Sequence, residues 1–420
     1  MIKNRAPISF INELAFFESS FSFALAAISF GYTQIISRDL VVKKNWKSIL
    51  YTGQSARFAF SITISFIGVI LSILTKDIFY ALIISPFIAL NVLFALYSKG
   101  KPLYASKLSF YRVLIPAIAL IFIDFLDVYY IVIYVVSQIA AMVLIGFLSS
   151  KELNIKYLTT PIFNNIREYT NNFLMGLTDL AISILQLGVL FIAGFFYEKD
   201  IVGNSYLILK IYVLFKGVSR VIFQIFYHQL YRKEVILLSE KTISLAGMIF
   251  FILLFFYPTE LILLFFTENY LENIYLIQII GFAGLISSLH ISSTASFLLR
   301  KKDKEYIFSY MFAIAFLLLG LFIIYYTNYY SYGIIISLFI GELCLLLSVF
   351  YFMRDIIGFS ERVSILFPLV IIITISTISH WLIDYLLINI LIDSILIGLY
   401  LIWFYDKNRI TLKQIGLNIN

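Results

Sequence analysis

The sequence has few of the residue types on which disulfide scaffolds, metal sites and most enzyme active sites depend. Its 420 residues include one cysteine and three histidines, and only 13% are Asp, Glu, Lys or Arg. Cys344 has no second cysteine with which to form an intramolecular disulfide, so cysteine usage indicates no redox compartment. The histidines are too far apart in the chain for a recognisable metal-binding motif: His228, His290 and His380.

Motifs of catalysis are also missing. The chain contains no glycine-rich loop of the kind that cradles phosphate and no serine-nucleophile motif. We therefore predict that the protein is not an enzyme and holds no cofactor or metal. A net charge of +7 is compatible with nucleic-acid binding, but the cations are scattered over many short links between apolar stretches. That distribution is typical of topology signals, so we predict no nucleic-acid partner.

Hydrophobic residues are abundant, at 61% of the chain with a mean hydropathy of +0.96. A helix needs about 20 apolar residues to cross about 30 Å of hydrocarbon, where lipid offers the backbone no hydrogen-bond partner. The sequence therefore predicts an all-α polytopic membrane protein with about thirteen transmembrane helices. The predicted spans are 14–36, 56–75, 78–97, 108–126, 128–149, 172–195, 204–230, 243–266, 271–299, 306–326, 332–353, 364–384 and 385–405.

The links between these spans alternate in charge. Every second link is rich in Lys and Arg, whereas the intervening links hold only Lys76 and Lys199 beside several acidic residues. By the positive-inside rule the basic links and the C-terminus are cytoplasmic; a bacterial cytoplasmic membrane as the location is what the family resemblance described below implies. An odd number of spans then places the N-terminus outside. The cations of the basic links are Arg38, Lys43, Lys44, Lys47, Lys99, Lys101, Lys107, Lys151, Lys156, Arg167, Arg232, Lys233, Lys241, Arg300, Lys301, Lys302, Lys304, Arg354, Arg362, Lys407, Arg409 and Lys413.

The predicted helix 204–230 differs from the others because it carries several cations at membrane depth. On a helical wheel four polar side chains share a sector about 80° wide, with Lys216 just beyond its edge: Lys210, Arg220, Gln224 and His228. A charge at the bilayer centre costs at least about 2.5–3.5 kcal/mol, so Lys216 and Arg220 must face a partner or a water-filled cavity. Two interpretations remain open, namely structural pairing with carboxylates and a cationic track for an anionic substrate.

Other ionisable residues also lie inside predicted spans. Asp179 of the 172–195 span could meet Arg220 across antiparallel neighbours, either as a salt bridge or as a proton or cation site. For Glu18, Glu342 and His290 we expect polar contacts within the bundle, because none of them should face lipid. The inner half of 271–299 is rich in serine, which fits either helix–helix contacts or a substrate pathway.

Two stretches carry a family resemblance. The segment NELAFFESSFSFALAAISFGYTQIISRDL, Asn12 to Leu40, resembles the second-helix region of polysaccharide-export and O-antigen flippases (Wzx-type) of the multidrug/oligosaccharidyl-lipid/polysaccharide (MOP) superfamily. The segment from Tyr197 to Lys233 is similar to the start of the second lobe, where an acidic turn such as Asp200 to Gly203 precedes the eighth helix.

The resemblance implies a fold of two pseudo-symmetric six-helix lobes followed by two accessory helices. Mapped onto this chain, it divides the sequence into an N-terminal lobe at 1–150, a cytoplasmic interfacial linker at 151–171, a C-terminal lobe at 172–356 and an accessory pair with a tail at 357–420. The count makes 14–36 the second helix, so the first helix of the family is apparently missing, through a truncated start or a disrupted gene.

The function implied by the resemblance is translocation of a polyprenyl-pyrophosphate-linked oligosaccharide, an O-antigen, capsule or similar unit, by alternating access. Lys210, Lys216, Arg220 and Gln224 would then bind the substrate, and Arg38, Arg57 and Arg112 would line its cytoplasmic access path. Asp179 or Glu18 would couple an ion or form a salt bridge. The implied partners are the lipid-linked glycan, the bilayer, and candidate glycan-polymerase and assembly proteins.

Alternative functions stay open. A lipid II flippase or a drug or metabolite exporter of the same superfamily would share the fold. A membrane glycan polymerase or ligase would share the hydropathy, although such enzymes usually carry a sizeable outer loop and the predicted outer links are short. A purely structural role is disfavoured by the cost of the buried charges.

Overall fold

The structure is a computed structural model, and it describes residues 8–32, 36, 40, 44–75, 78–122, 130–167, 173–226, 230–265, 268–327, 329–383 and 385–414. Within these ranges every regular element is a helix, which confirms the predicted all-α class. The chain divides into two compact units, Met1–Tyr206 and Leu207–Asn420, which we describe separately.

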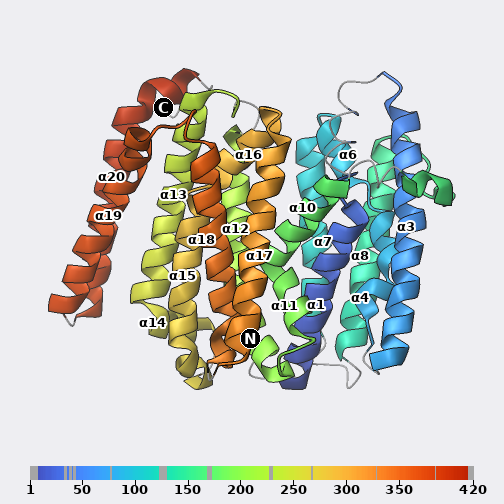
Figure 1. Ribbon diagram of the computed structural model, residues 1–420, viewed down its shortest axis with the longest axis horizontal. Helices are drawn as coiled ribbons and strands as arrows, with labels where there is room; N and C mark the ends of the chain where they lie inside the picture. The colour runs from blue at the N-terminus through green and yellow to red at the C-terminus, as the bar shows by residue number, and fades with distance from the viewer. Residues whose placement is uncertain are drawn as a thin grey trace. The chain divides into compact units, whose positions relative to one another are not determined.

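The first unit is built around α1, which packs against α10 and α11 and also against α4 (Figure 1). Helix α3 packs against α4 and α5, and α7 packs against α8. Helix α12 begins in this unit and continues into the second. The bounds are α1 Ile8–Ser29, α3 Trp46–Thr75, α4 Tyr80–Ile83, α5 Ser85–Ala89, α6 Leu93–Ser98, α7 Pro102–Phe122, α8 Tyr130–Glu152, α10 Phe173–Ser183, α11 Val189–Ala193 and α12 Lys199–Phe226.

The second unit has a packed centre and a peripheral hairpin. Helix α15 packs between α13 and α18, and α17 packs along α18. Helices α19 and α20 lie side by side at the edge of this unit, where α19 contacts α13 (Figure 1). The bounds are α13 Lys233–Phe256, α14 Pro258–Phe265, α15 Ile274–Ser288, α16 Ile291–Leu299, α17 Asp303–Tyr325, α18 Gly333–Phe352, α19 Phe359–Leu382 and α20 Leu386–Gln414.

In the described part of the chain, eleven helices are long and apolar enough to cross a membrane. Two of the thirteen predicted spans are not among them. The span 78–97 is divided into α4, α5 and α6, because Pro86 lies at the start of α5 and Asn91 forms a turn in which its side chain accepts the Leu93 N–H at 2.9 Å. The span 204–230 corresponds to α12, whose cations lower its hydropathy.

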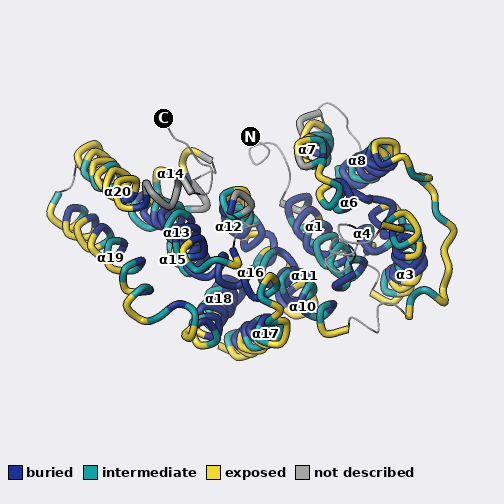
Figure 2. The backbone as a smooth tube through the Cα atoms, turned by 90° about the horizontal axis from the view of Figure 1, so that it is seen from above, coloured by how far each residue is buried: buried dark blue, intermediate teal, exposed yellow. Residues whose placement is uncertain are grey.

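The surface of the accessory hairpin is apolar. Trp381 is 82% exposed and Leu387 is 80% exposed, and the tube view shows exposed residues along much of α19 and α20 (Figure 2). In water such a surface would associate, whereas in a bilayer it faces hydrocarbon. The predicted lobe boundaries at 150, 171 and 356 concern a pseudo-repeat that helix packing does not test, and they stay a prediction.

Candidate functional site

The cations of α12 occupy different environments. Lys210 and Lys216 are half-buried, and Arg220, one turn beyond Lys216, is exposed. The side chain of Gln224 and the whole of His228 lie outside the described residues. The cationic surface of α12 therefore rests on Lys210, Lys216 and Arg220.

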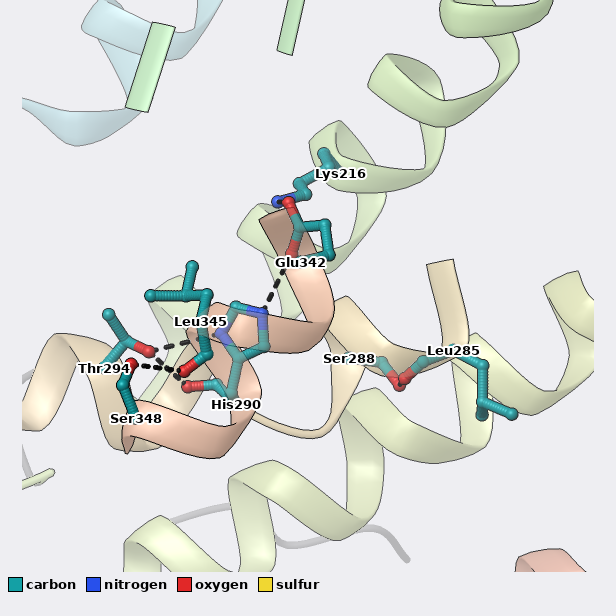
Figure 3. A network of polar contacts seen from close by, with 8 residues as sticks. All are labelled: Lys216, Leu285, Ser288, His290, Thr294, Glu342, Leu345 and Ser348. Carbon is teal, nitrogen blue, oxygen red and sulfur yellow. Dashed lines mark hydrogen bonds and ion pairs between the residues drawn. The ribbon is translucent and has the colours of Figure 1, made fainter. Parts of the chain in front are cut away.

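Lys216 belongs to a three-residue cluster in the second unit (Figure 3). Its Nζ lies 2.7 Å from Oε1 of Glu342, and Oε2 of the same carboxylate lies 3.0 Å from Nε2 of His290. The relative exposures of the side chains are 16% for Lys216, 0% for Glu342 and 2% for His290. We call these residues the Lys216–Glu342–His290 cluster. Its members come from α12, α18 and the joint between α15 and α16.

Glu342 is the only charged residue of α18, a helix with otherwise apolar and small side chains. An ionised carboxylate in such a position is costly unless it is paired and hydrogen-bonded. Both of its oxygens have a partner here, one in Lys216 and one in His290. The cluster therefore satisfies the expectation that Glu342 and His290 make polar contacts inside the bundle.

A break in the predicted 271–299 helix places His290 in the cluster. Helix α15 ends at Ser288 and α16 begins at Ile291, and His290 between them has φ −127° and ψ −12°. Thr294 holds the joint, because its N–H and its hydroxyl donate to the His290 carbonyl at 2.8 and 2.7 Å. The Thr294 Oγ1 also lies 3.2 Å from Nδ1 of the ring. The imidazole is thus held between Thr294 and Glu342.

The serines around this joint serve helix–helix contact. Ser292 shares a hydrogen bond of 2.7 Å with Ser239 of α13. Ser288 lies against Gly247 of α13, where an added Cβ would be 2.5 Å from the Ser288 Cβ. Small residues at these positions allow α13 to approach α15 and α16 closely. Of the two interpretations of the serine-rich segment, these contacts agree with the one in which the serines serve helix–helix packing.

The cluster has defined chemical capabilities. Lys216 and Glu342 form the kind of structural ion pair that the sequence left open as one interpretation of the cations. The imidazole beside the carboxylate can also bind or release a proton, and Lys216 can exchange its carboxylate for another anion. In the residues described, no group of three or more His, Cys, Asp or Glu side chains is arranged to hold a metal ion.

The predicted access-path arginines lie in the first unit. Arg57 of α3 is 4% exposed, donates to Gln54 and to the Asn91 carbonyl at 3.0 Å each, and lies over the Phe94 ring. Arg112 of α7 is half-buried and has an interaction partner. Arg38 lies outside the described residues. Their role in an access path stays a prediction.

The two predicted coupling carboxylates both make hydrogen bonds within the first unit. Glu18 of α1 accepts from the Tyr134 hydroxyl at 2.6 Å. Asp179 of α10 accepts from the Gly31 N–H at 2.7 Å, just beyond the end of α1. Gly31 has φ +73° and lies so close to α10 that an added Cβ would be 2.7 Å from the Met175 Cβ. Asp179 thus anchors the end of α1, and its pairing with Arg220, which would join the two units, stays a prediction.

Among the described residues, three further buried charged side chains were predicted neither as site residues nor as ionisable groups with partners inside the bundle. Glu240 of α13 is 1% exposed and accepts hydrogen bonds from the backbone and the hydroxyl of Ser293. Arg362 of α19 is 7% exposed, with its guanidinium 3.7 Å from the centre of the Phe350 ring. Asp393 of α20 accepts from the Tyr257 and Ser376 hydroxyls at 2.6 Å each. For Asp393 the available signal was a lone carboxylate inside the predicted span 385–405.

Comparison with known proteins establishes the fold. No protein-family profile matches the sequence, and no curated protein matches it either. The structure is similar to an inward-facing multidrug resistance MATE family transporter of the MOP superfamily, with a TM-score of 0.62 and 16% identity over 83% of this chain and 90% of that one.

Two further solved structures have the same fold. The lipid II flippase MurJ, in an inward closed conformation, gives a TM-score of 0.61 and 17% identity over 95% of this chain and 98% of that one. A MOP superfamily transporter from Pyrococcus furiosus gives 0.56 and 13% identity over 84% and 88%. The chain therefore has the fold of MOP-superfamily transporters, and these neighbours are transporters and a flippase. At such identities the likeness concerns the fold alone.

Proposed function

We propose that this protein is a flippase of a bacterial cytoplasmic membrane. Its substrate would be a polyprenyl-pyrophosphate-linked oligosaccharide, such as an O-antigen or capsule repeat unit, moved from the cytoplasmic to the outer face. The observation that carries the proposal is the set of cations on α12, with Lys216 held inside an otherwise apolar helix bundle. The fold shared with a lipid II flippase supports the same class of activity.

The chemistry of the substrate fits these cations. A lipid-linked glycan consists of an apolar tail, an anionic pyrophosphate and polar sugars, so its carrier must supply positive charge where the head group crosses. Along α12, Arg220 lies ten positions after Lys210, which is about 15 Å at the helical rise of 1.5 Å per residue, and Lys216 lies between them. That length suits successive contacts with a pyrophosphate moving along the helix.

Transport would proceed by alternating access, in which the bound head group is exposed first to one side of the membrane and then to the other. We propose that Arg38, Arg57 and Arg112 serve the cytoplasmic access path and that Gln224 extends the α12 surface. The C-terminus would be cytoplasmic, as the basic links predict. A glycan polymerase and assembly proteins would receive the product on the outer face.

Two alternatives share the fold. A lipid II flippase would use the same pyrophosphate chemistry, so only the identity of the glycan separates it from the proposed activity. A drug or metabolite exporter is supported by the likeness to MATE transporters but gives no reason for the three cations that α12 carries beyond its first turn. A glycan polymerase or ligase belongs to a different class and would act on glycans already outside.

The test is the sidedness of lipid-linked glycan in cells that depend on this protein. Arg220→Gln, in protein that still inserts, should lower export about ten-fold or more, because a charge-assisted contact is worth about 1.5–3 kcal/mol. Unpolymerised lipid-linked units should build up on the cytoplasmic face. Lys304→Gln, which removes an exposed cation of a basic link, is the matched control and should export normally.

The outcomes separate the candidates. Normal export by the Arg220 variant would remove this residue from the site. Normal translocation with unpolymerised units accumulating outside in depleted cells would favour the polymerase, and an unchanged glycan pool would favour the exporter.

A further inference from the structure

The hydrogen bonds of His290 favour one arrangement of its ring protons. A threonine hydroxyl has one hydrogen, and Thr294 donates it to the His290 carbonyl at 2.7 Å. The same oxygen lies 3.2 Å from the imidazole Nδ1, where either atom can be the donor. The shorter distance to the carbonyl favours Nδ1 as the donor toward the Thr294 Oγ1.

The other ring nitrogen faces the carboxylate. Nε2 of His290 lies 3.0 Å from Oε2 of Glu342, and a hydrogen bond of that length requires one proton between the two atoms. An ionised carboxylate is only an acceptor, so either Nε2 donates to it or the carboxyl itself carries the hydrogen. With Nδ1 as a second donor, the pair holds one proton more than a neutral imidazole beside an ionised carboxylate.

That proton sets the charge of the whole cluster. With it, Lys216, Glu342 and His290 sum to +1, and without it they sum to zero. Loss of the proton would leave a neutral imidazole, which can keep its one hydrogen on Nε2 while the Thr294 hydroxyl donates to Nδ1. The imidazole would then no longer compensate the charge of Glu342, and Lys216, at 2.7 Å, would be the cation that remains beside the carboxylate.

We infer that the His290–Glu342 pair is a proton-binding site and that the bound proton releases Lys216 to hold an anion. With the proton present, the carboxylate is shared with or neutralised by the imidazole, so Lys216 can turn to a pyrophosphate. With the proton absent, Lys216 stays in its ion pair with Glu342. Proton and anion therefore bind with positive linkage, each raising the affinity for the other. The anion half of this inference rests on the proposed function, whereas the proton site does not.

In the part of the chain that the structure describes, Lys216 and His290 are the charged or chargeable partners that act on Glu342, and the nearby cation of α12, Arg220, is exposed. The further titratable side chain beside the carboxylate is Tyr212 of α12, and Tyr310 of α17 lies near that phenol. Phenols are uncharged near neutral pH. The Tyr212 ring also lies 5.1 Å from the Lys216 Nζ, where its face favours the ammonium. The charge of the cluster thus depends on the proton of the His290–Glu342 pair.

The proton site can be tested without a ligand. The chain has three histidines, so a His228→Gln/His380→Gln variant in lipid nanodiscs leaves His290 as the only ¹⁵N-imidazole signal. We expect both ring nitrogens to be protonated or to share a proton near pH 6, and one proton to be lost as the pH rises. A ring that holds a single proton throughout pH 5–8 would overturn the site. If the double variant does not fold, the difference between labelled wild-type protein and His290→Gln gives the same signal.

The linkage is tested by calorimetry with farnesyl pyrophosphate as the probe. Titrations in two buffers of different ionisation enthalpy report proton uptake, which should approach one per probe where the pair is deprotonated. The Kd should rise up to about ten-fold per pH unit there, the slope for one linked proton. His290→Gln should abolish both the uptake and the pH dependence, whereas His380→Gln should keep them.

The failures are distinguishable. Binding without proton uptake in the wild-type protein would overturn the linkage and leave the proposed function standing. Absence of probe binding at every pH, in protein whose His290 signal is normal, would overturn the pyrophosphate role of Lys216 and with it the anion half of the inference.

Discussion

At the scale of single residues, the Lys216–Glu342 pair offers the sharpest test of the buried cluster. Glu342→Gln leaves Lys216 without its carboxylate in an apolar bundle, and breaking one side of a buried pair costs about 3–5 kcal/mol. The Lys216→Gln/Glu342→Gln double variant leaves no uncompensated charge on either residue and should recover most of that loss. The measurement is the free energy of unfolding of the purified protein, taken as a double-mutant cycle. Additive losses would mean that the two side chains do not interact.

The sequence predicts which ionisable residues need a partner inside the bundle, but it does not predict which residues those partners are. Charges at membrane depth single out Lys216, Glu342 and His290, because lipid cannot solvate them. Glu342 lies 126 positions from Lys216, and no local pattern connects them. Glu240 was not predicted for a different reason. Its helix begins at Lys233, whereas the predicted span begins at 243. Polar residues in the first turns lower the local hydropathy, so a prediction from hydropathy misses this part of the helix.

At the scale of elements, the contact between α13 and α15 depends on Gly247. A Cβ there would lie 2.2 Å from the Ser288 Oγ and 2.5 Å from its Cβ, so Gly247→Ala should push the helices apart and destabilise the protein. In Gly398→Ala of α20 the new methyl meets no atom within 4 Å, and the better helix former should leave stability unchanged or raise it. Thermal unfolding of both variants checks the comparison.

A compensating change makes this prediction specific. Ser288→Gly removes the obstructing side chain, so Gly247→Ala/Ser288→Gly should unfold at a higher temperature than Gly247→Ala alone. If the second substitution only adds to the loss, close approach at this position is not what holds α13 to α15.

Hydropathy locates helices well and their interruptions poorly. The predicted span 271–299 is apolar throughout, yet the helix breaks beside His290, since a break preserves the apolar character of the segment. The interruption of the predicted span 78–97 has a clearer signal in the sequence, because Pro86 and Asn91 are residue types that end or redirect helices. The joint between α15 and α16, which positions His290, could therefore be located only in the structure.

At the scale of the whole molecule, the alternation of basic and acidic links predicts the orientation of every helix. Only the sequence pattern supports it, because a bundle of apolar helices has no intrinsic inside or outside. The overall class followed from composition, since a chain with 61% hydrophobic residues has few soluble folds open to it.

The orientation can be measured on α17, because its first residues are predicted to lie on the cytoplasmic side and its last residues on the outer side. The single native cysteine allows a cysteine-free Cys344→Ser background, into which Lys304→Cys or Tyr326→Cys is introduced. Both positions are exposed; Lys304 lies at the start of the candidate span Asp303–Tyr325 and Tyr326 directly follows its end. In right-side-out vesicles a membrane-impermeant maleimide should label position 326 at once and position 304 only after permeabilisation, because the Lys-rich link at 300–304 is retained inside. The reverse pattern would invert the direction of transport that we propose, and labelling of both positions in sealed vesicles would mean that α17 does not span the bilayer.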